Sequence, residues 1–550
     1  MQGFDYIIVG GGSAGCVIAN RLSADPAVRV ALIEAGPSDL GFAARLKATL
    51  PVGNIFLLPQ ARYNWQYEFT GGVGVENRTI PCPRGRMLGG CSSVNGSVYM
   101  RGHRSDYDDW RAAGNEGWGF DDVLPAFKSH EKRLFGDSAY HGREGELDVQ
   151  QPRAVNPLTR AFVGSAVAAG HRRNDDFNGP EQDGFGIWDV NQRHGTRVSS
   201  SRAFLHPVMS RRNLTVLTDC FVERIDLSHG SATGVTVVKE GLRESISAAQ
   251  EVILAGGTIN SPHLLMLSGI GSAPALETQG VRTHHDLPGV GRNLQDHACA
   301  PVTMMDPSSH AYALSWQSLP RVLASPFQYL LDRSGMLATN AAEGGGLFRT
   351  RPELDRPDVQ VTLLAGLKDT ARAIPREHGI MLLVTLLRPR SRGSVTLASS
   401  NPADRPLIHP AFLEHGEDVQ TLVAGVRETR RILSMAPIAE HLGIERLPGR
   451  ALGSDEELAQ AIRRTLFTVH HPVGTCKMGP SGDAEAVVDA RLRVHGVERL
   501  RVADASIMPT IVAGNTSAPA MMIGERAASF ILGREPMAQG SVAMPEAAVA

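Results

Sequence analysis

The sequence predicts a mixed α/β fold, with a Rossmann-like domain built on a mostly parallel sheet and an α+β domain built on an antiparallel sheet. Near its start, a short apolar run ends in glycines and is followed by a helix-like segment and a second apolar run. Another buried-strand pattern that ends in glycines spans 252–257. Residues 300–460 instead contain alternating runs such as Val359–Thr362 and Ser394–Leu397, which are typical of antiparallel strands.

The first unit is a predicted strand at Tyr6–Val9, a glycine turn and a helix, and its spacing is that of a dinucleotide site. In the spacing Gly10-x-Gly12-x-x-Gly15, the first glycine allows the turn and the second lets a pyrophosphate approach the backbone. The third lets the helix pack close to the strand. Glu34 follows Gly15 by 19 residues, where a carboxylate can accept hydrogen bonds from a ribose.

The same residues also fit a serine nucleophile elbow, because Gly11-x-Ser13-x-Gly15 matches GxSxG. That elbow needs earlier strands to supply a sheet and an oxyanion-hole amide, and only 12 residues precede Ser13. We therefore interpret Ser13 as part of a phosphate-binding loop. The glycine spacing alone leaves an NAD dehydrogenase open.

Composition narrows the class of protein. The chain has 550 residues, of which 42% are hydrophobic and 20% charged, and its formal net charge is −2. No basic stripe with interleaved aromatics occurs, so we expect no nucleic-acid binding. No apolar run approaches the roughly 18 residues of a membrane span, so we expect no integral membrane segment. We expect no metal site, because His194, His284 and His285 lack ligand spacing.

The start of the chain and its cysteines predict a cytoplasmic location. The first predicted strand begins almost at Met1, which leaves no room for a cleaved signal peptide. The six cysteines are scattered and form no CxxC pair, as expected for reduced thiols. Peripheral association with a membrane stays open.

The middle of the chain alternates between loops and regular elements. Residues 35–80 are loop-rich, and an aromatic island at Asn64–Tyr67 is interpreted as packing. Gly85–Gly96 has too many glycines and small polar residues for a regular element, so we expect a loop whose backbone lies against a ligand. Residues 105–134 predict helices, and residues 135–195 predict surface excursions.

The strands and helices after residue 213 are predicted from the same kinds of apolar pattern. Strands are predicted at 214–217, 221–225 and 232–239, a helix after Gly257, and further helices near 417–435 and 454–466. Leu500–Ala503 resembles the opening strands and is expected to rejoin the first sheet. Thr516 and the residues that follow open a predicted helix that runs to about Leu532. The tail 537–550 is expected to be frayed.

Five separated blocks together make the chain similar to a known family. They are the glycine unit Gly10–Glu34, the loop Gly85–Asn95, Gly257–Gly271, Leu287–His297, and His471–Thr475 with Asp504–Asn515. The chain resembles the glucose–methanol–choline (GMC) oxidoreductases, which are flavoenzymes that bind FAD. It looks most like the bacterial alcohol and choline dehydrogenase branch.

The resemblance implies a discontinuous FAD-binding domain with an inserted substrate domain. The FAD-binding parts would be residues 1–155, 196–305 and 466–535, the last carrying the catalytic pair. An excursion at 156–195 would belong with the substrate domain, which would occupy 306–465. Residues 536–550 would form a flexible tail.

The resemblance also implies the residues that bind FAD, and it favours a non-covalent cofactor. Some relatives carry a histidine that bonds to the flavin where this chain has Val94. The helix after Thr516 would direct its positive end to the flavin N1–C2=O region. The implied cofactor-binding residues are Gly10, Gly12, Ser13, Ala14, Gly15, Glu34, Trp65, Gly89, Gly90, Ser93, Asn95, Gly96, Val222, Asp504, Asn515 and Thr516.

Oxidising a small-molecule alcohol needs a hydride acceptor and a base for the hydroxyl proton. Histidine, with a pKa near 6.5, suits the base. By resemblance, His471, directly before Pro472, is the catalytic base and Asn515 is its partner. His470 is a weaker candidate for lining the site. An amide at Asn515 can donate to the substrate oxygen without competing for its proton.

Several functional alternatives stay open. A loose alignment puts Met305, with Asp306 beside it, where choline-oxidising relatives have a carboxylate, and Thr362 near a family histidine. We therefore expect a neutral primary alcohol, converted to an aldehyde, and keep choline as an alternative. The electron acceptor could be O2, a quinone or a carrier. The fold also hosts hydroxynitrile lyases and a flavin photodecarboxylase, which are alternatives of another class.

Overall fold

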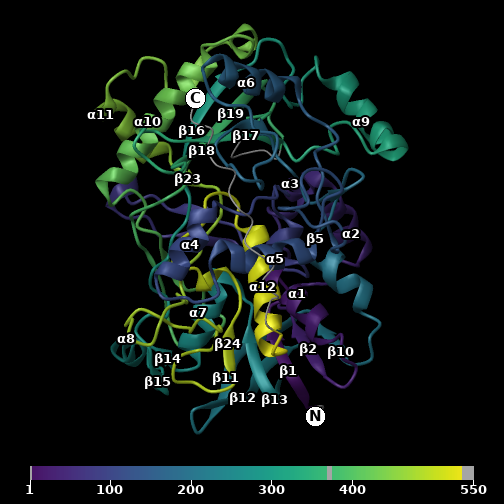
Figure 1. Cartoon of the computed structure of the whole chain (residues 1–550), viewed down its shortest axis with the longest axis vertical. Coiled ribbons are helices and arrows are strands. Elements are labelled where there is room, and N and C mark those ends of the chain that lie inside the picture. The colour runs from purple at the N-terminus through teal and green to yellow at the C-terminus, as the bar shows by residue number, and fades with distance from the viewer. Residues whose placement is uncertain (1–2, 368–373, 535–550) are drawn as a thin grey trace.

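A computed structural model describes residues 3–367 and 374–534, and it contains two large sheets, one in each half of the molecule. In Figure 1 the first sheet occupies the lower half and the second the upper half. The predicted mixed α/β fold is confirmed. The first sheet takes its strands from residues 4–254 and 500–502, and the second from 184–187 and 298–468. The predicted domain boundaries stay a prediction.

The first sheet is organised around its longest strand, β13 (Leu242–Leu254). The second half of β13 pairs in parallel with β1 (Phe4–Val9) on one side and with β24 (Leu500–Val502) on the other. Its first half pairs antiparallel with β12 (Ser231–Lys239). The sheet order is β10-β2-β1-β13-β12-β11, with β2 at Val30–Ile33, β10 at Leu214–Leu217 and β11 at Cys220–Ser228. The prediction that 500–503 rejoins this sheet is confirmed.

Two helices that are far apart in sequence pack side by side on this sheet. They are α1 (Ser13–Leu22), in the dinucleotide unit, and α12 (Ser517–Ile531), in the last predicted helix. A Cβ at Gly524 of α12 would lie 2.8 Å from the carbonyl oxygen of Ala14, so only glycine allows this approach. Figure 1 shows α12, in yellow, running beside α1.

The second sheet is antiparallel, with strand order β22-β16-β19-β18-β17-β7 and β23 paired to β16. Its central strands are almost fully buried. A glycine of α10, Gly425, would bring a Cβ within 2.8 Å of Val384 in β19, so this helix lies directly on the sheet. The strands are β7 (Gly184–Ile187), β16 (Ala298–Met305), β17 (Ala342–Phe348), β18 (Val359–Leu364), β19 (Gly379–Leu386), β22 (Glu445–Leu447) and β23 (Phe467–Thr468).

The expectation of surface excursions at 135–195 is wrong. That segment contains α6 (Pro157–Ala168), whose Leu158 and Phe162 are buried, and β7, which forms an edge of the second sheet. The glycines and prolines suggested loops, but Asn156 caps α6 and Pro157 occupies its first turn, where a missing N–H costs nothing.

The predicted helices within 105–134, after Gly257, near 417–435 and near 454–466 are confirmed, whereas residues 35–80, expected to be loop-rich, contain two α-helices and a strand pair, and α8 and α9 were not predicted. The other helices are α2 (Phe42–Thr49), α3 (Asn54–Leu57), α4 (Arg104–Ala112), α5 (Phe120–His130), α7 (Gly257–Leu267), α8 (Ala273–Thr278), α9 (Leu319–Asp332), α10 (Gly416–Leu433) and α11 (Asp455–Thr465). Short paired strands are β3 (Tyr67–Phe69), β4 (Ile80–Cys82), β5 (Glu131–Lys132), β6 (Leu147–Asp148), β8 (Gln192–Arg193), β9 (Thr196–Arg197), β14 (Ile270–Gly271), β15 (His285–Asp286), β20 (Ser394–Thr396) and β21 (Leu407–His409). The tail 537–550 lies outside the described residues.

Candidate active site

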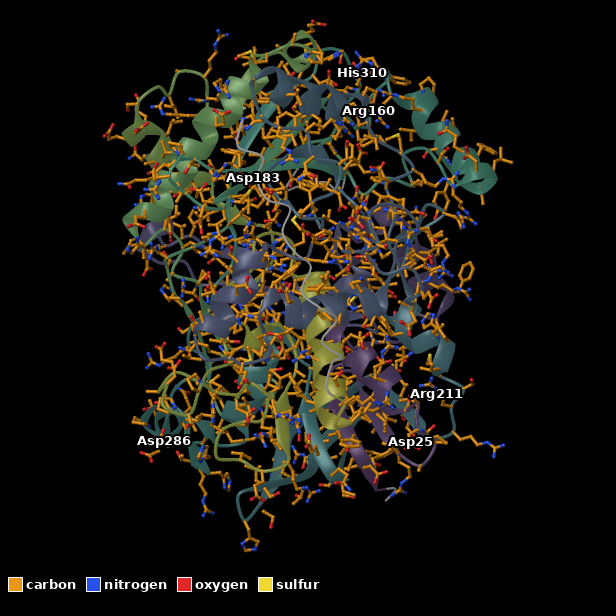
Figure 2. The ribbon with its side chains drawn as sticks, viewed as in Figure 1. Asp25, Arg160, Asp183, Arg211, Asp286 and His310 are labelled. Atoms are coloured by element: carbon orange, nitrogen blue, oxygen red, sulfur yellow. The ribbon has the colours of Figure 1, made fainter. Side chains whose placement is uncertain are left out.

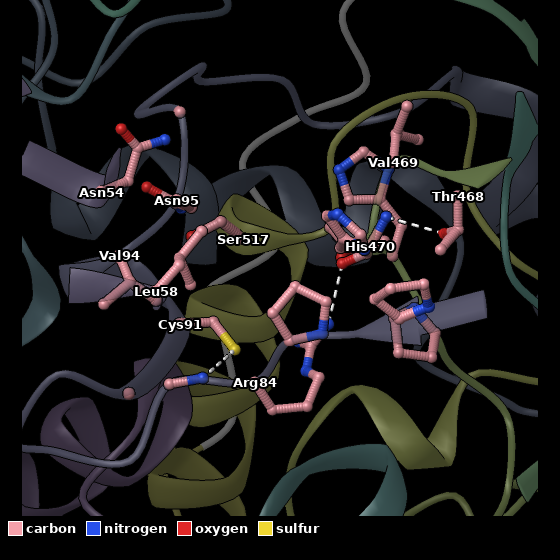
Figure 3. Close-up of a pocket in the computed structure, with 18 of the residues that line it drawn as sticks. Asn54, Leu58, Arg84, Cys91, Val94, Asn95, Thr468, Val469, His470 and Ser517 are labelled. Carbon is pink, nitrogen blue, oxygen red and sulfur yellow. Dashed lines mark hydrogen bonds between the residues drawn. The ribbon is translucent and has the colours of Figure 1, made fainter. Parts of the chain in front are cut away.

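A cavity of about 1330 Å³ extends from the glycine turn after β1 to the two histidines before Pro472. Pockets for one small ligand are typically ~300–1,000 Å³, so this cavity has room for a dinucleotide and a substrate together. Figure 3 shows part of its wall, where Asn54, Asn95, Arg84 and His470 come from segments far apart in the chain.

The glycine turn has the shape that the spacing predicts. Gly10 has φ +109°, and a Cβ there would lie 2.4 Å from the carbonyl oxygen of Ala255. A Cβ at Gly15 would lie 1.9 Å from the carbonyl oxygen of Gly10, so only glycine lets α1 start here. At Gly12 the nearest atom to an added Cβ is 3.9 Å away, which leaves open space beside the start of α1. The N–H groups at a helix start have no intrahelical partner and suit a phosphate.

Glu34 lies at the end of β2 and is buried, with its side chain facing this turn. Its two carboxylate oxygens accept the N–H groups of Gly11 at 2.9 Å and Gly36 at 2.8 Å. Burial raises the pKa of Glu34 to about 7, while the two amides and the nearby charge of Arg86 oppose that rise. The carboxylate therefore organises the turn as well as lining the cavity.

The loop Gly85–Gly96 packs directly on the glycine turn after β1. Gly89 donates its N–H to the carbonyl oxygen of Gly11 at 2.7 Å, and a Cβ at Gly90 would lie 2.8 Å from the Cα of Gly12. The Ser93 hydroxyl donates to the carbonyl oxygen of Leu88 at 2.8 Å. Two segments 80 residues apart thus form one surface of small residues along the cavity.

The structure brings most of the predicted site residues to this cavity. Those that line it are Gly10, Gly12, Ser13, Ala14, Glu34, Trp65, Gly90, Asn95, Gly96, Val222, Asp504, Asn515, Thr516 and, for the chemistry, His470 and His471. Gly15, Gly89 and Ser93 do not line it and instead support the two loops. Trp65 stacks on Tyr67 with ring centroids 5.7 Å apart, so it packs and lines the cavity at once.

Three chain segments are tied together at the carboxyl edge of the first sheet. Asp504 follows β24, and its Oδ2 accepts the N–H of Gly257 at 2.8 Å and the hydroxyl of Ser261 at 2.6 Å. Beyond it, the start of α12 presents two buried polar atoms, Asn515 Oδ1 and Ser517 Oγ, that have no hydrogen-bond partner among the described residues. Both residues line the cavity, so these atoms point to a polar ligand.

His471 and Asn515 form the predicted pair. Asn515 Nδ2 lies 3.1 Å from His471 Nε2, and the amide can only donate, so Nε2 accepts. Burial lowers the pKa of His471 well below its ordinary value of 6.5, and the neighbouring His297, His470 and Arg84 side chains lower it further. His471 is therefore a neutral imidazole at neutral pH, with its lone pair at the cavity.

A second histidine determines which nitrogen of His471 carries the proton. His297 Nε2 lies 3.2 Å from the carbonyl oxygen of Leu387, which can only accept, so this nitrogen is protonated. Burial lowers the pKa of His297 to about 4, so the ring is neutral and its Nδ1 accepts. That Nδ1 lies 3.0 Å from His471 Nδ1, which must donate. The proton on Nδ1 leaves His471 Nε2 free to act as a base.

The backbone around His471 is held by two buried side chains. Asp296 Oδ1 accepts the N–H of His471 at 2.8 Å, and the Thr468 hydroxyl donates to Asp296 Oδ2 at 2.5 Å. Burial raises the pKa of Asp296 to about 6. Arg84 Nη1 donates to the carbonyl oxygen of His470 at 2.8 Å, as Figure 3 shows. His470 itself has φ +68°, a conformation that this bond supports.

Sequence reasoning missed the roles of His297, Asp296 and Arg84. The block Leu287–His297 contained two of them, but a role needs a partner, and Leu387 and His471 lie 90 and 174 residues away. No local pattern could supply these contacts. Met305 and Asp306, which the loose alignment put near the position of a choline-binding carboxylate, do not line the cavity. Thr362, which it put near a family histidine, does line the cavity.

Fold and site together define a dinucleotide-dependent oxidoreductase. The parallel strands, the open space at Gly12 and the unpartnered polar atoms at Asn515 and Ser517 fit a long phosphate-bearing cofactor. The His–Asn pair at the far end supplies a base and a donor. The described residues therefore fit FAD, whose two ends would lie at the glycine turn and at the pair.

Comparison with known proteins identifies the family. Models of the GMC oxidoreductase family match residues 4–299 and 389–524 of this chain. The chain is 43% identical over 539 residues to the alcohol dehydrogenase [acceptor] of Pseudomonas putida, and the match covers 97% of each protein. It is 39% identical to the mitochondrial choline dehydrogenase of Mus musculus, covering 98% of this chain and 91% of that relative.

Solved structures also resemble this chain along nearly its whole length. The pyridoxine 4-oxidase of Mesorbium loti superposes with a TM-score of 0.85 at 33% identity, over 96% of this chain and 98% of that one. Aspergillus oryzae RIB40 formate oxidase, studied for its FAD modification, superposes with a TM-score of 0.88 at 26% identity, over 97% and 98%. This chain belongs to the GMC oxidoreductase family. The expected family, enzyme class and FAD cofactor are confirmed, while the individual site residues stay predictions.

Replacing Glu34 by glutamine tests the cofactor end. A glutamine offers one acceptor oxygen where two backbone amides now bond, and an unsatisfied buried group costs ~1–3 kcal/mol, so the FAD dissociation constant should rise about tenfold or more. Fluorescence titration of the flavin-free protein measures this dissociation constant.

Acid precipitation should release all flavin from the wild type, because Val94 offers no atom for a covalent bond.

Asp286→Asn is the matched control. Asp286 also accepts a backbone N–H, that of Ala273 at 2.9 Å, but it is exposed and lies at the lower edge of the molecule in Figure 2. Its substitution should leave FAD binding unchanged. Equal FAD affinity in Glu34→Gln and the wild type would exclude the proposed role of Glu34.

Proposed function

We propose that this protein is an FAD-dependent dehydrogenase or oxidase that converts a neutral, apolar primary alcohol to an aldehyde. The observation that carries the proposal is the His471 imidazole, whose unprotonated Nε2 lies at the cavity 3.1 Å from Asn515 Nδ2. Bound FAD supplies the hydride acceptor, the flavin N5. The residues supply the base, the donor and the pocket.

The pair divides the work on the substrate hydroxyl. His471 Nε2 accepts the hydroxyl proton, and Asn515 Nδ2 donates to the oxygen as negative charge develops there. His297 keeps the proton of neutral His471 on Nδ1 and so holds Nε2 ready. The start of α12 brings its positive end to the same region, where it favours negative charge by ~0.3–1 kcal/mol.

The cavity wall supports an apolar substrate. On the side of the second sheet, aliphatic side chains dominate, among them Pro301, Leu364, Leu367, Met381, Leu383 and Leu447. Among the described residues that line the cavity, the carboxylates are Glu34 and Asp504, and both lie at the edge of the first sheet. A quaternary ammonium would find no counter-charge among the described residues of the substrate part.

Choline is the second candidate, because several relatives named choline dehydrogenase are 38–40% identical over nearly the whole chain. The electron acceptor is also part of the proposal. It is O2, a quinone or a carrier, and the comparisons do not specify which. A cytoplasmic location is likewise proposed, supported by six cysteines that form no disulfide in the described part of the chain.

A panel of alcohols added anaerobically tests the substrate class. We expect primary aliphatic and benzylic alcohols to bleach the flavin absorbance, and choline to bleach it at least tenfold more slowly, because its charge meets no carboxylate. Adding air or a quinone dye then identifies the acceptor. Fastest bleaching by choline would overturn the substrate assignment, and turnover of a cyanohydrin without bleaching would indicate a lyase.

His471→Ala should lower kcat/KM by ~10²-fold or more, because the general base is lost. The FAD content should stay at the wild-type level, since the change lies at the far end of the cavity from the glycine turn. His229→Ala, a substitution on a turn far from the cavity, is the control and should keep full activity. Near-wild-type turnover of every alcohol by His471→Ala would exclude it as the base.

His297→Ala tests the positioning role. Without the acceptor at His297 Nδ1, His471 can place its proton on Nε2, and we expect kcat to fall about tenfold, as for a lost hydrogen bond of ~1.4 kcal/mol. His297→Gln keeps an acceptor oxygen and should recover most of the loss. KM and FAD affinity should stay near wild type in both variants. Equal defects in both would mean that His297 acts only through packing.

A further inference from the structure

The exposed apolar side chains of this protein are gathered on one part of its surface. Of the eighteen large apolar side chains that are exposed in the described residues, eleven come from two short segments, 40–56 and 314–331. Trp316, Phe42 and Leu331 are each nearly 90% exposed. Large side chains this accessible, when clustered, mark a contact surface. We call the side chains of these two segments the apolar rim: Leu40, Phe42, Leu46, Phe56, Leu314, Trp316, Leu319, Leu323, Phe327, Leu330 and Leu331.

Helix α9 has two apolar faces with different surroundings. Its inner face carries Val322 and Pro326, which line the cavity, and Tyr329, which is buried. Its outer face carries Leu323 and Phe327, which are 62% and 68% exposed and do not line the cavity. The outer apolar face of α9 is therefore left largely uncovered by the described residues.

The two segments of the rim lie together at the same side of the cavity. Phe56 of α3 lines the cavity, as do Val322 and Pro326 of α9. Figure 1 shows α9 projecting from the molecule on the side where α2 and α3 lie.

Cations accompany the rim. Residues 38–62 and 314–337 hold five of them, Arg45, Lys47, Arg62, Arg321 and Arg333, against two carboxylates, Asp39 and Asp332. Asp39 is buried and accepts hydrogen bonds from Ser201 and His206, so Asp332 is the one exposed carboxylate of the two segments. The chain as a whole has a formal net charge of −2, so this surface differs in sign from the whole.

We propose that the apolar rim docks the protein on an anionic lipid bilayer. A helix with Phe and Leu on its outer face, an exposed Trp just before its start and arginines near its ends can lie in the plane of a membrane surface, and its cations bind acidic headgroups. None of the described helices is long and apolar enough to cross a membrane, so the docking is peripheral. Because the inner face of α9 lines the cavity, this docking would bring the cavity next to the lipid phase.

Vesicle binding by the holoprotein tests the proposal without turnover, so its failure is distinct from that of the proposed function. We expect co-sedimentation with vesicles of phosphatidylcholine mixed with phosphatidylglycerol, weaker binding to phosphatidylcholine alone, and release by salt. The variant Leu323→Glu/Phe327→Glu/Leu331→Glu should bind roughly tenfold less or worse. Because these side chains do not line the cavity, its turnover of a water-soluble alcohol should match the wild type.

The control variant is Leu242→Glu/Leu407→Glu/Ile444→Glu, which changes three equally exposed side chains away from the rim and should bind as the wild type does. Should the rim variant fold poorly, hydrogen exchange on the wild type decides, with protection of 316–333 expected on adding the anionic vesicles. No vesicle binding by the wild type, or equal binding by the rim variant, overturns the proposal. So does a wild-type dimer that the rim variant loses without any vesicle binding, because a second copy then covers the rim.

Discussion

The parallel pairing of β13 with both β1 and β24 is the constraint on which the site depends. The glycine turn follows β1, Asp504 follows β24, and α7 follows β13, so all three meet at one edge of the sheet. The backbone hydrogen bonds of these strands place the turn relative to the segment that leads to Asn515. The protein groups that would bind the two ends of a cofactor spanning the cavity are therefore already positioned, which lowers the entropy lost on binding.

The chemistry at the far end rests on a chain of hydrogen bonds that ends at a backbone carbonyl. Leu387 directly follows β19 of the second sheet. His471 lies in the segment that runs from β23 of the second sheet to β24 of the first sheet. The tautomer of the proposed base is thus controlled by a contact that crosses between the two sheets. Because the carbonyl cannot titrate, this control is insensitive to pH as long as His297 is neutral, which its pKa of about 4 ensures.

The sequence predicted what depends on local pattern and missed what depends on distant contacts. The glycine unit, the return of 500–503 and the helix after Thr516 were predictable because each has a short-range reason: a tight turn, an apolar run or an early proline. His471 and Asn515 came through family resemblance, because a histidine before proline has no function of its own. Helix α6 was missed because the surrounding segment 135–195 contains many glycines and prolines, which suggested loops, and because its burial comes from the second sheet. The His471 tautomer was out of reach because it depends on His297 and Leu387.

The position of β24 also bears on how the chain folds during synthesis. Val252 of β13 pairs with Leu500, so about 250 residues must emerge from the ribosome before this edge of the first sheet can close. The whole second sheet, apart from β7, is made in that interval. Contacts of such long range form slowly, and an unpaired strand edge is prone to wrong partners. The nascent chain thus needs its last tenth before the cofactor site is complete, which makes late truncations more damaging than their length suggests.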